Sequence, residues 1–234
     1  MIRPVAALVA AALVLVACGD DEPDLAVLQD DSPPIAAVNT DEGAVDPPSA
    51  TVPADLPEEY VPAVGPVEVT GDPLPGYPDV SGPDPAIGLQ APTVVGLDAD
   101  GEPVRIDAAT TGPTMVVFLA HWCNHCNEEV PVLNELGAQG RFPDDLRVVG
   151  VATASEPTAP NYPPGEWLAE KGWPYDWMLD GIDVEAQSWT AASAYGVSGF
   201  PSIVVIDGDG VVVDRWSGAV GADAITAAVD AALA

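Results

Sequence analysis

A continuous apolar run, TMVVFLA at residues 114–120, leads directly into the sequence HWCNHC at residues 121–126. A run of this kind is typical of a strand buried on both faces of a sheet. The residues after the cysteine pair repeat apolar side chains at helical spacing, with Pro131 as a predicted kink. The chain must therefore fold so that a buried strand ends at the cysteine pair and a helix begins there.

The HWCNHC stretch has three possible roles: a metal site, a redox dithiol or a pair of buried thiols. Its side chains His121, Cys123, His125 and Cys126 are of the types that bind Cu(I) or Zn. Four ligands within six residues rarely form a tetrahedron, however, and no histidine follows His125. We expect His121 to point to the other side of the strand–helix turn. The choice among the three roles depends on the cellular compartment and on the surrounding fold.

The N-terminus predicts export. Arg3 is followed by an apolar run over residues 5–17, which is too short to span a bilayer but is the right length for the core of a signal peptide. The motif Leu-Val-Ala-Cys ending at Cys18 resembles the lipobox of bacterial lipoproteins, whose cysteine is acylated after cleavage. The resemblance implies a signal peptide over residues 1–17 and a lipid-anchored protein on the extracytoplasmic face of the bacterial membrane. An uncleaved anchor or an ordinary signal are the alternatives. Exported proteins retain disulfides, so dithiol chemistry is favoured over a structural zinc site.

Charge and composition divide the rest of the chain into two parts. The formal net charge of −31 argues against nucleic acid as a partner and against electrostatic binding to anionic lipid. Residues 18–85 contain no lysine or arginine and many prolines, which predicts an acidic disordered tether. Residues 86–234 have regular apolar patterns and are long enough for one domain with its own core.

The patterns within residues 86–234 predict an α/β domain with a mixed central sheet. Asp100-Gly101 marks the turn of a first hairpin, and a Gly-Asp-Gly turn marks a second one. The remaining predicted elements alternate between strands and helices. Besides the strand at 114–120 and the helix after it, we expect a hairpin at 93–106, strands at 146–152 and 175–180, helices at 163–172, 185–197 and 222–234, and a hairpin at 202–216.

The two cysteines are expected to differ in reactivity because of their positions. Cys123 lies at a helix N-terminus, where free N–H groups and the helix dipole stabilise an anion and lower the pKa of a thiol. Cys126 lies one turn further along the helix and is more buried. Cys123 is therefore the predicted nucleophile, and Cys126 the thiol that resolves a mixed disulfide.

Residues 86–234 resemble the thioredoxin superfamily, and within it the TlpA/ResA-like thiol–disulfide oxidoreductases. The resemblance rests on Trp122 and the cysteine pair, on Pro131, and on the block YGVSGFPSIVVIDGDGVVV at residues 195–213. It implies a thioredoxin-like fold, with a mixed central sheet flanked by helices, an N-terminal β-hairpin and a central helix–strand insert at 153–180. It also implies an exchange of the Cys123–Cys126 disulfide with protein thiols.

The resemblance also implies further site residues. Pro201 aligns with the cis-proline that packs against the disulfide, and Phe200 before it becomes a candidate substrate contact. Thioredoxins carry a buried aspartate where this chain has Val117. Glu129 matches a glutamate of the TlpA/ResA branch and is the candidate carboxylate for proton transfer; a surface helix glutamate is the alternative.

Trp122, Asn124, His125 and Glu129 are the residues expected to tune the dithiol. A histidine before the second cysteine resembles DsbA-type oxidants, in which it stabilises the thiolate, so we expect a more oxidising potential than that of thioredoxin. The reaction needs no cofactor or metal beyond the dithiol. It does need a membrane redox partner, which the sequence does not name.

Three other functions remain as alternatives. The first is a copper- or zinc-binding thioredoxin-fold chaperone. The second is a peroxidase, which would need a threonine three residues before the attacking cysteine, where this chain has Ala120. The third is a non-catalytic surface adaptor whose cysteines are vestigial.

Overall fold

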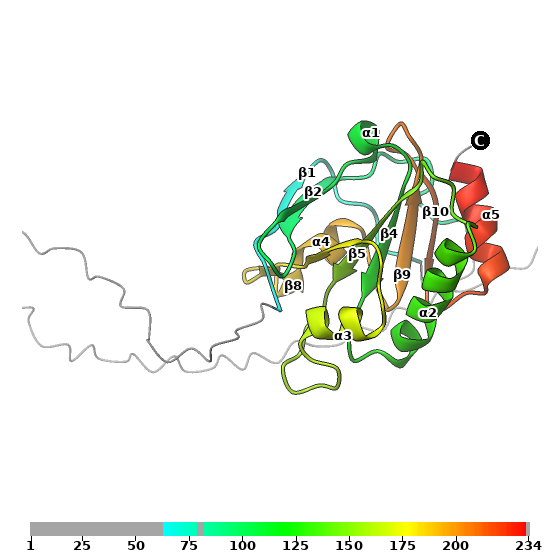
Figure 1. The fold of residues 1–234 in the computed structure, drawn as a ribbon. Coiled ribbons are helices and arrows are strands. Elements are labelled where there is room, and N and C mark those ends of the chain that lie inside the picture. Colours follow the sequence, from blue (N-terminus) through cyan, green and yellow to red (C-terminus); the bar gives the residue numbers. More distant parts are fainter. Residues whose placement is uncertain (1–62, 79–81, 233–234) are drawn as a thin grey trace, which may run out of the picture. The chain divides into compact units, whose positions relative to one another are not determined.

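The computed structural model describes residues 63–78 and 82–232. Its centre is a five-stranded mixed sheet with the strand order β10-β9-β4-β5-β6 (Figure 1). Strands β4, β5 and β6 are parallel to one another, whereas β9 is antiparallel to both β4 and β10. The five strands are β4 (Thr114–Leu119), β5 (Arg147–Ala152), β6 (Asp176–Leu179), β9 (Ser202–Ile206) and β10 (Val212–Ser217). The predicted thioredoxin-like architecture is confirmed.

Strand β4 is buried along its whole length because sheet neighbours flank it and core side chains cover both of its faces. Its side chains alternate between the two faces, as the geometry of a strand requires. Val116 and Phe118 belong to one hydrophobic core cluster, and Met115, Val117 and Leu119 belong to the other. The apolar run therefore supplies both cores at once.

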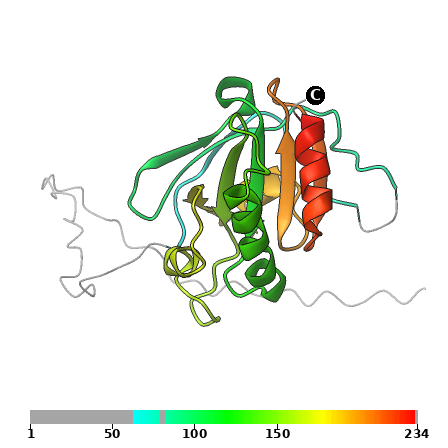
Figure 2. The same cartoon turned by 45° about the vertical axis from the view of Figure 1, so that its right-hand side comes forward.

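Helices α2 (Asn124–Ala138), α3 (Pro164–Glu170) and α5 (Ala222–Ala232) supply buried side chains to the core that contains Met115. Figure 2 shows α2 and α5 side by side over the sheet. The other core is closed by α1 (Ala108–Thr111), by α4 (Thr190–Ala194) and by strands of a second sheet. Within the described residues, no helix is both long enough and apolar enough to cross a membrane.

The second sheet contains the predicted hairpin and one strand that was not predicted. Its strands β1 (Glu68–Thr70), β2 (Thr93–Leu97) and β3 (Pro103–Ile106) are antiparallel, in that order. The prediction of a disordered tether over residues 18–85 is wrong in its last part, because β1 pairs with β2 and the side chains of Ala63 and Leu74 are buried. This segment has no apolar periodicity from which a strand could be predicted. It forms a strand because it pairs with the edge of β2. Residues 18–62 lie outside the described residues.

A buried ion pair fastens the same segment to the central sheet. Arg215 in β10 donates from Nε and Nη2 to the carboxylate of Asp84, at 2.8 and 2.6 Å. Its Nη1 donates to the carbonyl oxygens of Pro75 and Tyr195, and the ring of Tyr77 lies 5.5 Å from its guanidinium carbon. Arg215 is almost wholly buried, so its charge is compensated by Asp84 and these oxygens.

The helix predicted over residues 185–197 is wrong in its first part. The chain there forms a two-stranded hairpin, β7 (Ile182–Asp183) and β8 (Ser188–Trp189), and only then enters α4. The buried carboxylate of Asp180 accepts the backbone N–H groups of Ala191 and Ala192, at 2.7 and 3.1 Å. These contacts start the helix at Thr190, because they satisfy N–H groups that lack partners within the first helical turn.

Candidate active site

The two cysteines lie where the sequence predicts, at the junction of β4 and α2. Cys123 is the N-cap of α2, with an extended backbone, and its carbonyl oxygen accepts the N–H of Asn127 at 3.1 Å. Cys123 is half-buried, whereas Cys126, one turn further along, is completely buried, and both are free thiols. One sulfur is therefore open to a partner molecule, and the other lies behind it in the core.

Burial controls the protonation of Cys126. Removal from water raises the pKa of the Cys126 thiol far above its ordinary value, and the nearby Cys123 and Glu129 raise it further. A hydrogen bond with the Ala120 backbone opposes the shift. Cys126 therefore stays a thiol until a base takes its proton.

Glu129 is a buried carboxyl group on the same helix, one turn after Cys126. Only 2% of it is exposed, so the alternative of a surface helix glutamate is wrong. Burial raises the pKa of Glu129, and the N–H of Val220, which donates to Oε1 at 3.5 Å, opposes the shift. Val117, at the position of the thioredoxin aspartate, is buried in the same apolar cluster as Cys126. Glu129 is thus a carboxyl group that can exchange a proton on the inner side of the cysteine pair.

Phe200 and Pro201 approach the cysteines from the other side. The peptide bond between them is cis, as the resemblance implies. The thiol of Cys123 donates to the carbonyl oxygen of Phe200 at 3.4 Å. The Phe200 ring meets the Trp122 ring edge-on, with the two centroids 6.1 Å apart. The loop that precedes β9 therefore forms one wall of the site.

Trp122, Asn124 and His125 are the exposed residues of the motif. The Trp122 indole Nε1 donates to the carbonyl oxygen of Ala154 at 2.7 Å. Asn124 and His125 occupy the first turn of α2, between the two cysteines in sequence. Both side chains can therefore act on the dithiol from the solvent side.

His121 is buried, and both of its ring nitrogens are engaged in hydrogen bonds. Its Nε2 accepts the N–H of Glu156 at 3.1 Å, which leaves the proton on Nδ1, 2.7 Å from the carbonyl oxygen of Pro160. Both nitrogens are thus engaged by the loop after β5. In the part of the chain that the structure describes, no three His, Cys, Asp or Glu side chains are grouped so as to hold a metal ion.

Asn127 is a site residue that the sequence analysis missed. Its Nδ2 donates to the carbonyl oxygens of Cys123 and His121, at 2.9 and 3.3 Å, and its Oδ1 accepts the indole N–H of Trp167 at 3.0 Å. Asn127 therefore links the cysteine turn to α3. The available signal was an amide side chain one turn after Cys123, at a position where a helix does not favour asparagine.

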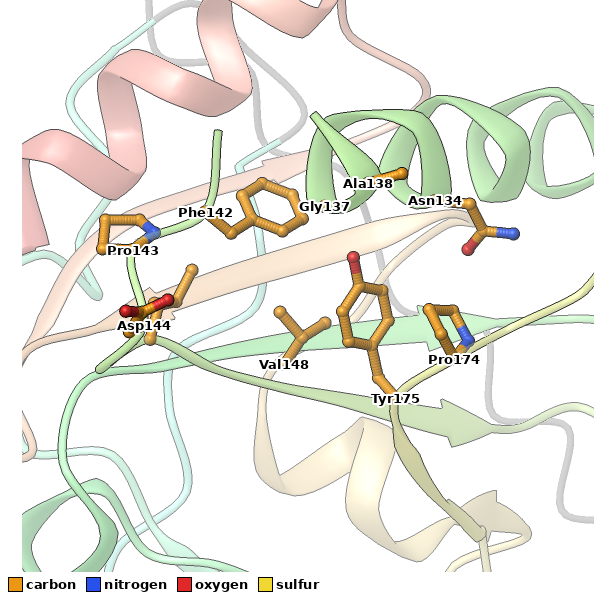
Figure 3. Close-up of a pocket in the computed structure, with 10 residues that line it drawn as sticks. Asn134, Gly137, Ala138, Phe142, Pro143, Asp144, Val148, Pro174 and Tyr175 are labelled. Carbon is orange, nitrogen blue, oxygen red and sulfur yellow. The ribbon is translucent and has the colours of Figure 1, made fainter. Parts of the chain in front are cut away.

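Two cavities are relevant to the site, one at the C-terminal end of α2 and one beside the cysteines. A cavity of about 450 Å³ at the C-terminal end of the helix is lined by Phe142, Tyr175 and Asn134 among others, as Figure 3 shows. The hydroxyl of Tyr175 there donates to the carbonyl oxygen of Leu133. The other cavity, about 510 Å³, is lined by Trp122 and therefore adjoins Cys123.

Comparison with known proteins gives consistent matches. Residues 87–215, which include the cysteine pair and Pro201, match the AhpC/TSA family. The chain is 33% identical over 130 residues to the thiol:disulfide interchange protein DsbE of Escherichia coli strain K12, covering 52% of this chain and 59% of that protein. It is 33% identical over 117 residues to the thiol:disulfide interchange protein CycY of Rhizobium leguminosarum bv. viciae, covering 50% of this chain and 56% of that protein. The matches thus span little more than half the length of these curated relatives.

A solved structure resembles the fold. The crystal structure of a putative thiol:disulfide interchange protein DsbE from Chlorobium tepidum superposes with a TM-score of 0.51 at 24% identity. The match covers 62% of this chain and 96% of that one. At this level of identity, the likeness supports the fold.

Proposed function

The chain belongs to the AhpC/TSA family, and from that premise we propose that it is a thiol–disulfide oxidoreductase that exchanges a Cys123–Cys126 disulfide with protein thiols. The observation that carries the proposal is the pair itself, a half-exposed thiol at a helix N-terminus with a buried thiol one turn behind it. The names of the two curated relatives, both thiol:disulfide interchange proteins, support the same reaction. No cofactor beyond the dithiol takes part.

The proposed reaction has two exchange steps. The Cys123 thiolate, at the N-terminus of α2, attacks a client disulfide; a Cys123–client disulfide forms and one client sulfur leaves with a proton. Cys126 then loses its proton and attacks Cys123, which releases the second client sulfur and leaves the Cys123–Cys126 disulfide. The client gains two electrons and two protons, and oxidation of client thiols is the reverse sequence.

The second step needs a base, because burial holds the proton on Cys126. We assign this role to Glu129, which is buried one turn away and whose pKa is raised by burial, as a group that takes up a thiol proton requires. Phe200 and Pro201 would contact the client chain beside Cys123. Trp122, Asn124 and His125 would tune the potential.

The reduction potential tests the proposal directly. We expect the pair to form a disulfide with a potential of roughly −120 to −200 mV, more oxidising than the roughly −270 mV of thioredoxin, because His125 stabilises the thiolate form. The measurement is equilibration with glutathione buffers followed by mass spectrometry of the trapped thiols. His125→Ala should lower the potential by at least about 30 mV, equivalent to a tenfold change in the equilibrium constant. A potential near that of thioredoxin would contradict the tuning role, and failure to form the disulfide would contradict the function.

We further propose that the protein is held at the extracytoplasmic face of a bacterial membrane by a lipid on Cys18, where a membrane redox partner exchanges electrons with the dithiol. Support comes from the apolar run at 5–17 and from the motif that ends at Cys18. Both lie outside the described residues. In bacteria fed labelled palmitate, the wild-type protein should carry label and sediment with membranes, whereas Cys18→Ser should carry none. Labelling of the serine variant, or an unlabelled wild type, would refute the anchor.

A further inference from the structure

Two cavities share one residue, Trp189, and the first of them is also lined by Trp122, the residue before Cys123. The first, about 510 Å³, lies between Trp122 and Trp189 and includes the loop residues Ser155 and Pro160. The second, about 320 Å³, is lined by residues of the β7–β8 hairpin itself, from Ile182 to Trp189. Trp189 therefore connects the cavity beside Trp122 to the hairpin.

The far end of this surface is apolar and exposed. Ile182 and Val184, on the β7–β8 hairpin, are 53% and 81% exposed. The carboxylate of Asp183 accepts the N–H groups of Glu185 and Ala186, at 3.0 and 2.9 Å, which fixes the hairpin turn. In Figure 1 the hairpin of β8 projects from the domain beside α4. Two exposed branched aliphatic side chains on one ordered turn, beside a cavity, form an apolar patch of the kind that marks a binding surface.

The near end of the surface carries one polar group without a partner. The Oγ of Ser155 is shielded from solvent and has no hydrogen-bond partner, although Ser155 lines the first cavity. The preceding residue, Ala154, has a left-handed backbone (φ 50°) and accepts the indole N–H of Trp122. A buried hydroxyl that lacks a partner is costly, so this wall of the first cavity is incompletely paired in the free protein.

The charges around the surface favour a polypeptide over a membrane as its occupant. Glu156 lines the first cavity, and Asp183 and Glu185 lie on the hairpin. Anionic lipid would be repelled by these carboxylates. A client bound through its sulfur to Cys123 would, in contrast, extend over Trp122, which belongs both to the motif and to the first cavity.

We propose that the surface from Trp122 over Trp189 to Ile182 and Val184, which we call the docking strip, binds apolar side chains that flank the reacting cysteine of a client polypeptide. The inference rests on the proposed function and adds to it a preference for one class of client.

The test compares two synthetic peptides, each with one cysteine in a mixed disulfide with glutathione. One has leucine and phenylalanine around the cysteine, and the other has serine and glycine. Reduced wild-type protein should react about tenfold faster with the apolar peptide, since covering one aliphatic side chain contributes at least that factor. The double variant Ile182→Ser/Val184→Ser should lose most of this preference and should react with oxidised glutathione at the wild-type rate.

The matched control is Ile87→Ser/Leu89→Ser. These residues are similarly exposed, at 44% and 43%, but lie beside the start of β10, at the opposite end of the sheet from Cys123. The control should keep the preference. A wild type without preference, or a hairpin variant that keeps it, would overturn the docking strip while the oxidoreductase function stands. A wild type that fails to react even with oxidised glutathione would overturn both.

Discussion

Replacing Cys126 by serine is expected to stop the exchange reaction halfway, with the client left bound to Cys123 by a disulfide. The half-exposed Cys123 keeps its position at the start of α2, so the first attack should proceed at close to the wild-type rate. The second attack has no sulfur and cannot occur, so turnover should be lost completely. The adduct is measured by mass spectrometry of the protein after incubation with a disulfide-containing peptide.

The Cys123→Ser variant tests whether the two cysteines have these separate roles. Cys123→Ser should form no adduct, because Cys126 is completely buried and its raised pKa keeps it a thiol. Turnover by the Cys126→Ser variant, or an adduct on Cys126 at a comparable rate in Cys123→Ser, would reverse the two roles. Both variants replace only a sulfur by an oxygen, so the fold should be retained.

Glu129→Gln is expected to slow the second exchange step about 100-fold near neutral pH, within the range of general acid–base catalysis, and to leave the first step unchanged. The amide keeps the shape of the carboxyl group but cannot take the proton of Cys126. In the wild type, the rate of the second step should fall as the pH drops below the raised pKa of Glu129, because the carboxylate is then protonated. Stopped-flow measurement of single turnovers across pH separates the two steps.

The same substitution should change how stability depends on pH. A carboxyl group whose folded pKa is raised stabilises the fold fully below its unfolded pKa, and this contribution is lost as the pH rises through the folded pKa. The free energy of unfolding of Glu129→Gln, relative to wild type, should therefore increase as the pH rises through that window. Glu128→Gln changes the exposed neighbour on the same helix and should alter neither property. Equal effects of the two substitutions would rule out a proton-transfer role for Glu129.

The sequence was sufficient for features that depend on local pattern. The buried strand β4 follows from an apolar run with sheet neighbours, and the position of Cys123 at a helix start follows from the change of period after it. The hairpins of β2–β3 and β9–β10 follow from their Gly-containing turns. In each case, the residues that decide the structure are neighbours in the chain.

Features that depend on distant partners were not predictable in this way. Strand β1 exists because the edge of β2 pairs with it, and α4 begins where it does because Asp180 reaches its N–H groups. The contacts of His121 and Asn127 join the cysteine turn to segments about 35 to 40 residues away in the chain. Such side-chain contacts to distant parts of the chain leave no periodic trace in the sequence.

The ion pair of Arg215 with Asp84 also has a mechanical consequence. Tension applied at the N-terminal end of the chain travels along the backbone only as far as the points where the backbone is fastened. Within the described residues it meets first the bond of the Gly65 N–H to the carbonyl oxygen of Asp180 and the β1–β2 pairing, then the bonds of Leu74 and Tyr77 to the α4 region, and then the ion pair at Asp84. While these attachments hold, load enters the domain through β2, Asp180, α4 and β10, and it reaches β4 through the neighbouring strands β5 and β9. The chain is thus not pulled directly at the strand that leads to the two sulfurs.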